Sequence, residues 1–214
     1  MKKSDEMIPL MNKIHNEDCL EFMKQVPDNY FDLVLTDPPY GIADKLTRDD
    51  STNHNNNFGK LYNKTNWNDT KPTKEVFNEI FRISKNQIIW GGNYFGLPAT
   101  RGILCWDKNI GHPTNFSHFE MAWTSFDRPA FKYVTSNDYK IKKHPTQKPL
   151  KLIDFCLEYA RLDKTAFIFD PFIGSGTTAV ACKSLGLGWC GCELEADYVA
   201  IANKRLEKVQ GSLL

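Results

Sequence analysis

The feature that most constrains the fold is a short apolar strand that two consecutive prolines bring to an abrupt end. Residues 31–36 are rich in Phe, Val and Leu, which is typical of a buried strand, and Pro38-Pro39 follow Asp37 directly. Proline has no backbone N–H to donate to a neighbouring strand, so the strand must end near Asp37. Open α/β sheets bind their ligands at the carboxyl ends of the strands. We therefore expect Asp37 and Tyr40 to lie at a ligand-binding edge of such a sheet.

This strand end carries groups that fit an exocyclic amino group. The Asp37 carboxylate and a proline carbonyl can accept the two hydrogens of an amine, and the Tyr40 ring can stack on the ring that carries it. We therefore predict that the catalytic residues are Asp37, Pro38, Pro39 and Tyr40.

The remaining chain alternates between strands and helices, which predicts an α/β domain with a mostly parallel sheet and helices on both faces. Strands are expected at residues 8–14, 31–36, 88–90, 102–106, 119–124, 131–134, 166–169 and 189–193. Helices are expected at residues 19–26, with Asp18 as the N-cap, and at 73–84, 149–160, 178–185 and 198–206.

A glycine-rich loop between a strand and a helix, residues 170–178, is the second informative feature. Gly174 and Gly176 allow a tight turn and a close backbone approach to a ligand, and the following helix offers free amide donors. Glu193 follows at about the spacing expected for an acid that binds a ribose. The loop alone predicts a nucleotide-like cofactor, which can be a nicotinamide dinucleotide or S-adenosylmethionine (SAM).

Composition limits the class of protein. A length of 214 residues fits a single domain spanning 1–214, and a hydrophobic fraction of 41% is ordinary for a globular protein. The net charge of +1 neither supports nor excludes a nucleic-acid partner. None of the six cysteines forms a CxxC pair, so we expect reduced thiols and no metal site. No signal segment or membrane-spanning run is present, which predicts a cytoplasmic protein without a membrane partner.

Two segments interrupt the alternation of strands and helices, residues 41–72 and 107–143. The first is long and polar, and it mixes Lys and Arg with Tyr62 and Trp67, a combination that suits phosphates and bases. We interpret residues 41–72 as a flap beside Tyr40 and both segments as target-recognition insertions. Their small size suggests a short recognition site or reliance on a homodimer.

The order of the two motifs favours one cofactor. A dehydrogenase usually carries its glycine fingerprint in the first strand–helix unit, whereas here it lies in the last third of the chain. At this point the chain resembles the DPPY-type amino-methyltransferases of DNA, in the permuted beta class in which the catalytic motif precedes the cofactor loop. The resemblance runs over residues 15–205 and rests on the motif at 37–40, the loop at 170–178 and residues 144–149, His-Pro-Thr-Gln-Lys-Pro.

The resemblance implies a Rossmann-like fold with permuted motif order, in which residues 102–106 and 119–124 form an antiparallel edge. It also implies SAM as the cofactor. Residues 170–177 resemble the loop around the methionine part of SAM, Glu193 the acid on the ribose, and Asp18 and Cys19 the pair on the adenine. Residues 146–148 resemble the segment that closes over the amino-acid end of SAM. The cofactor-binding residues expected in this way are Asp18, Cys19, Thr146, Gln147, Lys148, Asp170, Pro171, Phe172, Gly174, Ser175, Gly176, Thr177 and Glu193.

The reaction that the resemblance implies is methyl transfer from SAM to the N6 amine of a flipped adenine in DNA. N4 of cytosine and an RNA base stay open, because the same amine geometry serves all three. Two other classes of protein also stay open: a catalytically silent nucleic-acid-binding module and an NAD-dependent dehydrogenase.

Overall fold

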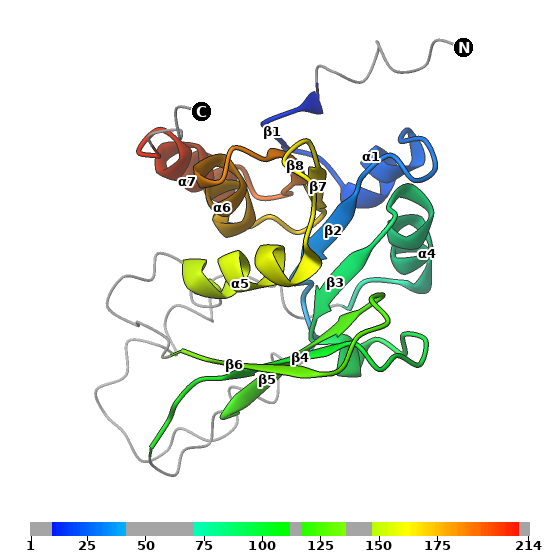
Figure 1. Ribbon diagram of the computed structural model, residues 1–214. Coiled ribbons are helices and arrows are strands. Elements are labelled where there is room, and N and C mark those ends of the chain that lie inside the picture. The colour runs from blue at the N-terminus through cyan, green and yellow to red at the C-terminus, as the bar shows by residue number, and fades with distance from the viewer. Residues whose placement is uncertain (1–9, 42–70, 112–116, 136–146, 210–214) are drawn as a thin grey trace, which may run out of the picture.

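Eight strands form one mixed sheet in the part of the chain that the computed structural model describes, residues 10–41, 71–111, 117–135 and 147–209 (Figure 1). Across the sheet the strands follow the order β1-β8-β7-β2-β3-β5-β4-β6. Strand β5 is antiparallel to both of its neighbours, and the other pairs are parallel. The strands are β1 (Lys13–His15), β2 (Leu33–Thr36), β3 (Gln87–Trp90), β4 (Ile103–Asp107), β5 (Phe119–Thr124), β6 (Phe131–Val134), β7 (Phe167–Asp170) and β8 (Gly188–Cys192).

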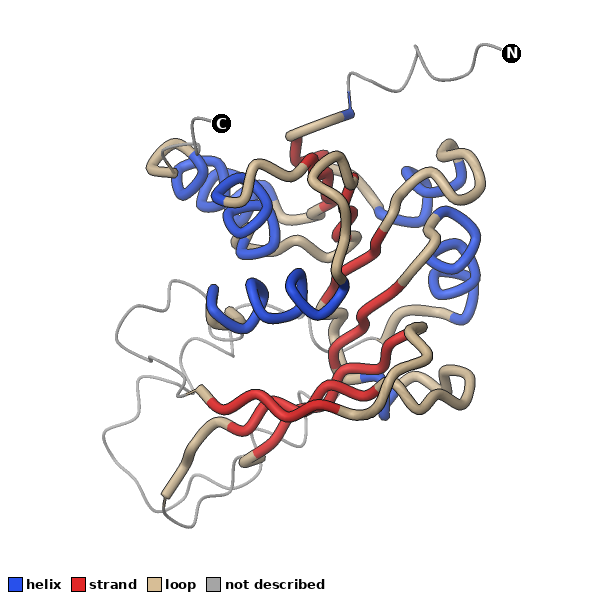
Figure 2. Tube along the Cα trace, viewed as in Figure 1, coloured by secondary structure: helices blue, strands red, loops and turns tan. Residues whose placement is uncertain are grey.

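Helices cover both faces of this sheet, as the alternation of elements predicts (Figure 2). Helices α1 and α4 pack on one face, and α5, α6 and α7 pack on the other. A short 3₁₀ turn, η3, follows β3 directly. The helices are α1 (Cys19–Lys24), α4 (Lys74–Ile83), η3 (Gly92–Tyr94), α5 (Leu150–Ala160), α6 (Thr177–Ser184) and α7 (Ala196–Leu206).

Strand β2 lies in the middle of the sheet, and all four of its side chains are buried. Leu33 and Leu35 point into the core under α5 and α6, whereas Val34 between them points into the core under α1 and α4. This alternation follows from the two-residue period of a strand, and burying each such side chain contributes about 1.5–3 kcal/mol. The apolar run therefore fixes β2 between two layers of helices.

The layer of α1 and α4 is stabilised by the N-cap of α1 and by one arginine on α4. The Asp18 carboxylate accepts the amide hydrogens of Leu20 and Glu21, so Asp18 is the predicted N-cap of α1. Arg82, near the end of α4, donates to the carbonyl oxygen of Met23, in the last turn of α1, and to that of Val26, just after the helix. These bonds satisfy carbonyl groups that the end of a short helix leaves free.

The described structure corrects the predictions at three points. Strand β1 begins only at Lys13, because Asn12 takes a left-handed conformation (φ 58°) that interrupts an extended chain; residues 8 and 9 lie outside the described ranges. Helix α1 ends at Lys24, before Pro27. The expected antiparallel pairing of β4 and β5 is confirmed, but β6 pairs in parallel with β4 and takes the outer position.

The chain reverses its direction across the sheet between β7 and β2. From β7 it continues to β8, and from β2 it continues to β3 on the other side. The carboxyl ends of β2 and β7 therefore lie side by side, and the Thr36 hydroxyl donates to Asp170 Oδ1 at 2.7 Å. Such a switch point is where open α/β sheets bind ligands.

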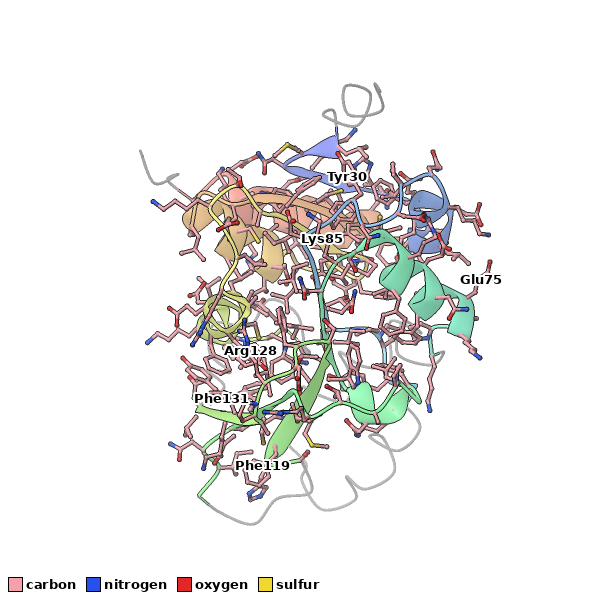
Figure 3. All side chains as sticks on the ribbon, turned by 45° about the vertical axis from the view of Figure 1, so that its right-hand side comes forward. Tyr30, Glu75, Lys85, Phe119, Arg128 and Phe131 are labelled. Atoms are coloured by element: carbon pink, nitrogen blue, oxygen red, sulfur yellow. The ribbon has the colours of Figure 1, made fainter. Side chains whose placement is uncertain are left out.

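The opposite end of the sheet is a separate surface. Tyr30 and Lys85 lie there, near the start of β2 and β3, and Lys85 pairs with Asp32 at 2.7 Å (Figure 3). Phe119 on β5 and Phe131 on the edge strand β6 are both half-exposed. None of the helices in the described ranges is long and apolar enough to cross a membrane.

Candidate active site

A cavity of about 250 Å³ opens at the switch point between β7 and β2. It brings together the strand end at Asp37 and the glycine loop after β7, which are more than 130 residues apart in the sequence. The predicted residues that line the cavity are Asp18, Cys19, Asp37, Pro39, Gln147, Lys148, Asp170, Pro171, Phe172, Gly174, Ser175, Thr177 and Glu193.

Among the described residues, three that we predicted for the site do not line the cavity: Pro38, Tyr40 and Gly176. Predicted Thr146 lies outside the described residues. Sequence reasoning missed several lining residues, among them Thr36, Trp90 and Tyr198. Thr36 precedes the Asp37 motif directly and could have been included, whereas Trp90 and Tyr198 reach the cavity only through the fold.

The Asp37 carboxylate is held by hydrogen bonds to both of its oxygens. The Tyr40 hydroxyl donates to Oδ1 at 2.6 Å, and the Lys148 ammonium donates to Oδ2 at 2.6 Å. The Asp37 side chain is 24% exposed and the Lys148 side chain 8%. An ionised carboxylate has about four lone-pair positions, so each Asp37 oxygen can accept one further hydrogen bond.

The ammonium group of Lys148 also contacts a second carboxylate, that of Glu120 on β5, at 2.9 Å. Glu120 was not predicted, although an acid inside the apolar run of residues 119–124 is an unusual feature. Burial raises the pKa of Asp37, and the Lys148 charge opposes that rise. Burial would lower the pKa of Lys148, but the Asp37 and Glu120 charges offset this and raise it. Lys148 is therefore a buried cation at neutral pH.

The Tyr40 ring is positioned by the turn after β3. It stacks on Tyr94, with ring centroids 4.9 Å apart. It also lies against Gly91, where an added Cβ would sit 2.2 Å from the nearest ring atom and 2.6 and 2.7 Å from that atom's two neighbours. These nearly equal distances place the Cβ over the face of the ring. Gly91 has a φ of 67°, so both its conformation and its missing side chain are needed here.

We predict that Gly91→Ala lowers the free energy of unfolding by about 2–4 kcal/mol, because it combines left-handed strain with a clash against Tyr40. Urea unfolding measures this effect. Gly96→Ala is the matched control, since Gly96 has a φ of 62° and no atom within 4 Å of its added Cβ. A loss no larger than that of Gly96→Ala would show that Tyr40 does not depend on Gly91.

The glycine loop takes the conformation that its sequence predicts. Gly174 and Gly176 have φ values of 52° and 80°, and Thr177 begins α6 directly afterwards. An added Cβ at Gly174 would make only an ordinary contact, with the Phe172 carbonyl oxygen at 3.9 Å, whereas one at Gly176 would lie 2.8 Å from Ala202 Cβ on α7. Arg205, also on α7, donates to the Ser175 carbonyl and to the Ser175 and Thr177 hydroxyls. Gly174 therefore serves the cavity, and Gly176 serves the packing of the loop against α7.

Asp170 anchors this loop to the sheet from a fully enclosed position. It accepts hydrogen bonds from the hydroxyls of Thr36 and Thr178 and from the Phe172 amide, and its side chain is 4% exposed. Burial raises the pKa of Asp170 to about 6, although these three hydrogen bonds oppose the rise. Ionised Asp170 therefore holds the loop at a cost in stability.

Asp170→Asn should reveal this cost. The folded-state pKa is raised above the ordinary Asp value of about 3.9, so folding stability falls as pH rises from about 4 to 6. An asparagine does not ionise, and we expect the variant to be more stable than the parent by roughly 1–3 kcal/mol above pH 7. Thermal unfolding at pH 8 and pH 4 checks this, with a gain of several degrees at pH 8 only. An equal loss at both pH values would contradict the argument.

Three further predicted residues complete the rim of the cavity. Glu193 follows β8, and its carboxylate accepts the Glu195 amide at 2.9 Å; burial raises the pKa of Glu193. Asp18 faces the cavity from the start of α1 while it caps that helix. Gln147 places its buried Oε1 at the cavity without a hydrogen-bond partner among the described residues. An unpaired buried acceptor is costly, which favours a ligand that donates a hydrogen bond there.

A switch-point cavity between a glycine loop and an acid at the next strand end defines an α/β protein that binds a nucleotide-like cofactor. A family model described as "DNA methylase" (N6_N4_Mtase) matches residues 60–204, which is more than half of the chain. The chain belongs to this family, the N6-adenine/N4-cytosine DNA methyltransferases.

Individual relatives agree with this family. Type II methyltransferase M1.MboII of Moraxella bovis is 26% identical, in an alignment that covers 94% of this chain and 98% of that protein. Type II methyltransferase M2.LlaDCHI of Lactococcus lactis subsp. cremoris is 30% identical over 155 residues, 70% of this chain and 52% of that protein.

Solved structures share the fold at low sequence identity. The crystal structure of the M1.HpyAVI–SAM complex is 20% identical, with a TM-score of 0.58 over 91% of this chain and 98% of that one. PvuII DNA methyltransferase, which is cytosine-N4-specific, is 16% identical with the same TM-score of 0.58, over 94% of this chain and 87% of that one. The chain thus has the Rossmann-like fold of these methyltransferases.

Proposed function

We propose that this DNA methyltransferase transfers the methyl group of SAM to the exocyclic N6 amine of an adenine in DNA. One observation carries the proposal: the Asp37 carboxylate faces the same cavity as the glycine loop that follows β7. A methyl acceptor held by Asp37 and a cofactor held by the loop would therefore meet. The preference for adenine rests on the Asp at the first position of the motif, which the family associates more with adenine than with cytosine.

The residues of the cavity fit SAM as the cofactor. SAM supplies an electrophilic methyl group on a positively charged sulfur. We propose that the loop from Asp170 to Thr177 holds its methionine part, and that Glu193 accepts hydrogen bonds from the ribose hydroxyls. Asp18 and Cys19 would contact the adenine, and the unpaired Gln147 Oε1 suits a donor such as the cofactor's ammonium group.

Asp37 and Pro38 would prepare the amine for attack. An aromatic amine is a weak nucleophile, because its lone pair is delocalised into the ring. Hydrogen bonds from the amine to Asp37 and to the Pro38 carbonyl would aim that lone pair at the methyl group and stabilise the positive charge that develops on nitrogen. Asp37 would then take up the released proton, directly or through water.

Tyr40 would stack on the base once it has left the duplex. Its ring is held by Gly91 and Tyr94, and its hydroxyl bonds Asp37, so one residue links the stacking surface to the acceptor. Most of the acceleration would come from alignment of the amine with the methyl group, without a covalent intermediate.

Lys148 contacts two carboxylates in the structure. The resemblance implies that residues 146–148 close over the amino-acid end of SAM, and in the structure the Lys148 ammonium group lies 2.6 Å from Asp37 and 2.9 Å from Glu120. A contact with SAM stays a prediction, and we propose that the main effect of Lys148 is on Asp37.

We propose that the chain forms a single methyltransferase domain and that its two insertions read the DNA sequence. Most of residues 41–72, including the expected flap, and residues 112–116 and 136–143 lie outside the described ranges. The described part of the second insertion contains β5 and β6, which lie toward the edge of the sheet opposite β1. A second copy of the chain could add contacts, which sedimentation of the protein on a DNA duplex would measure.

Incubation with labelled SAM tests the proposed function. The substrate is plasmid DNA from a host without DNA methylation, and the modified nucleoside is identified after digestion. N6-methyladenine is the expected product. N4-methylcytosine as the product would identify the N4 amine of cytosine as the methyl acceptor. Label on RNA alone would identify RNA as the substrate. Absence of label on either nucleic acid would refute the proposed function.

A further inference from the structure

Glu120 is an acid in an otherwise apolar stretch of β5. The strand reads Phe-Glu-Met-Ala-Trp-Thr, and it is the antiparallel strand between β3 and β4. The Glu120 side chain is only 22% exposed, so its charge requires partners. It has two: Lys108 Nζ lies 2.6 Å from Oε1, and Lys148 Nζ lies 2.9 Å from Oε2.

These contacts form a row of four alternating charges that ends in the cavity. The order is Lys108, Glu120, Lys148, Asp37, with two positive and two negative groups. Although burial raises the pKa of Glu120, the two ammonium groups more than offset it and lower that pKa to about 2. Glu120 is therefore ionised wherever the protein is folded at ordinary pH, and it is a permanent second anchor for Lys148.

We propose that Glu120 is a positioning residue for methyl transfer, which holds the Lys148 ammonium group at one oxygen of Asp37 and leaves the other positions of that carboxylate to the substrate amine. This inference rests on the proposed function. Lysine has a flexible four-carbon stem and acts as a point charge, so one carboxylate alone would not fix its position. Without Glu120, the ammonium group would keep only Asp37 and the Tyr40 hydroxyl, at 3.2 Å, as polar partners among the described residues. Both lie on the Asp37 side, so the ammonium group would be free to move across both Asp37 oxygens and compete with the amine.

Glu120 and Lys148 have opposite electrostatic effects on Asp37. The Lys148 charge lowers the pKa of Asp37, and the Glu120 charge raises it. Other groups face Asp37 or its partners from the remaining elements and stay unchanged in the experiment. They are Tyr40 on the same loop, Tyr94 on η3, Asp170 on β7, and Lys108 behind Glu120.

Because Lys148 lowers the Asp37 pKa and Glu120 raises it, removing each charge should shift the pH dependence of the rate in opposite directions. A purely structural role of Glu120 would not produce this result. In the full-length protein we expect Lys148→Met to raise the acid limb of the pH–rate profile by about 1–3 pH units, and Glu120→Gln to lower it by up to about one unit. Glu120→Gln should also reduce kcat about 10- to 100-fold without changing the affinity for SAM, because misplacement of an acceptor affects the chemical step. Rates are measured with labelled SAM and unmethylated plasmid DNA.

Matched controls share the substitution but lie away from the cavity. Glu79→Gln breaks the partly buried pair with Arg82 on α4, and Lys85→Met breaks the pair with Asp32 at the opposite end of the sheet. Neither should move the acid limb. A shift of the same sign in Glu120→Gln and Lys148→Met, or no shift in either, would overturn the inference.

A second measurement does not depend on methyl transfer. The Asp37 carboxyl carbon can be titrated by NMR in protein labelled at its aspartate carboxyl groups, with Asp37→Asn to identify the signal. We expect its pKa to move up in Lys148→Met and down in Glu120→Gln. An unchanged Asp37 pKa in Lys148→Met would be enough to refute the inference, even if Glu120→Gln failed to fold. Failure of the proposed function would give a different result. The parent protein would then not methylate DNA, whereas the Asp37 pKa would still shift in the two variants.

Discussion

Asp37→Ala is expected to abolish detectable methyl transfer to DNA while SAM still binds. The substitution removes the acceptor that would orient the amine and take up its proton, and each of these effects contributes about 10²–10⁴ in rate. SAM binding should persist, because the glycine loop, Glu193 and Asp18 do not depend on the Asp37 side chain. Transfer of label to DNA measures the first effect, and a thermal shift with SAM measures the second.

Asp37→Asn separates charge from shape in the same experiment. It keeps the size of the side chain but replaces an acceptor with an amide donor, so we expect nearly the same loss of rate as with alanine. Asp32→Asn is the matched control. Asp32 lies at the other end of the same strand, where its carboxylate bonds Lys85 and the Phe167 amide. Full activity in Asp37→Asn would exclude Asp37 as the acceptor of the amine.

Gly174→Val is expected to raise the Kd for SAM by about tenfold to a hundredfold. Gly174 lines the cavity, and a Cβ there would enter space that no protein atom fills. A branched side chain in this position would stand where the cofactor must approach the backbone, and every tenfold loss corresponds to about 1.4 kcal/mol. Calorimetry with SAM measures the change in Kd.

The backbone conformation needs its own control, since valine is strained at the left-handed φ of 52°. Gly96→Val carries the same strain at a φ of 62°, in open space and away from the lining of the cavity. We expect both variants to lose a similar stability, about 1–3 kcal/mol, and only Gly174→Val to lose SAM affinity. Equal affinities would mean that the loop does not hold the cofactor.

The Asp37 motif and the glycine loop were predictable, because each depends on residues that are neighbours in the sequence. The double proline after an apolar run ends β2 at Asp37, and the two glycines after β7 make the turn into α6. Most of the strands and helices were predictable in the same way, since their periods and turn residues are local properties. The sharing of one cavity by these two features followed from the general rule for open α/β sheets.

Glu120 and Gly91 could not be found in this way, because their roles arise from pairing between distant segments. Glu120 reaches Lys148 only because β5 enters the sheet antiparallel, next to β3. Gly91 matters only because the Tyr40 ring lies over it from the loop that follows β2. A single sequence shows an acid in an apolar strand or a glycine in a turn, but it does not show which side chain lies opposite.

The pairing of β2 with β7 has a consequence for how the protein is made. These two central strands are separated by more than 130 residues, and β1 likewise pairs with β8 near the other end of the chain. During synthesis β1 and β2 emerge before β7 and β8, so the strand edges that these later strands will cover are at first unpaired. Contacts of such high sequence separation form slowly. The nascent chain therefore forms its cavity only after β7 and β8 have been synthesised, and until then the edges of β1 and β2 are exposed.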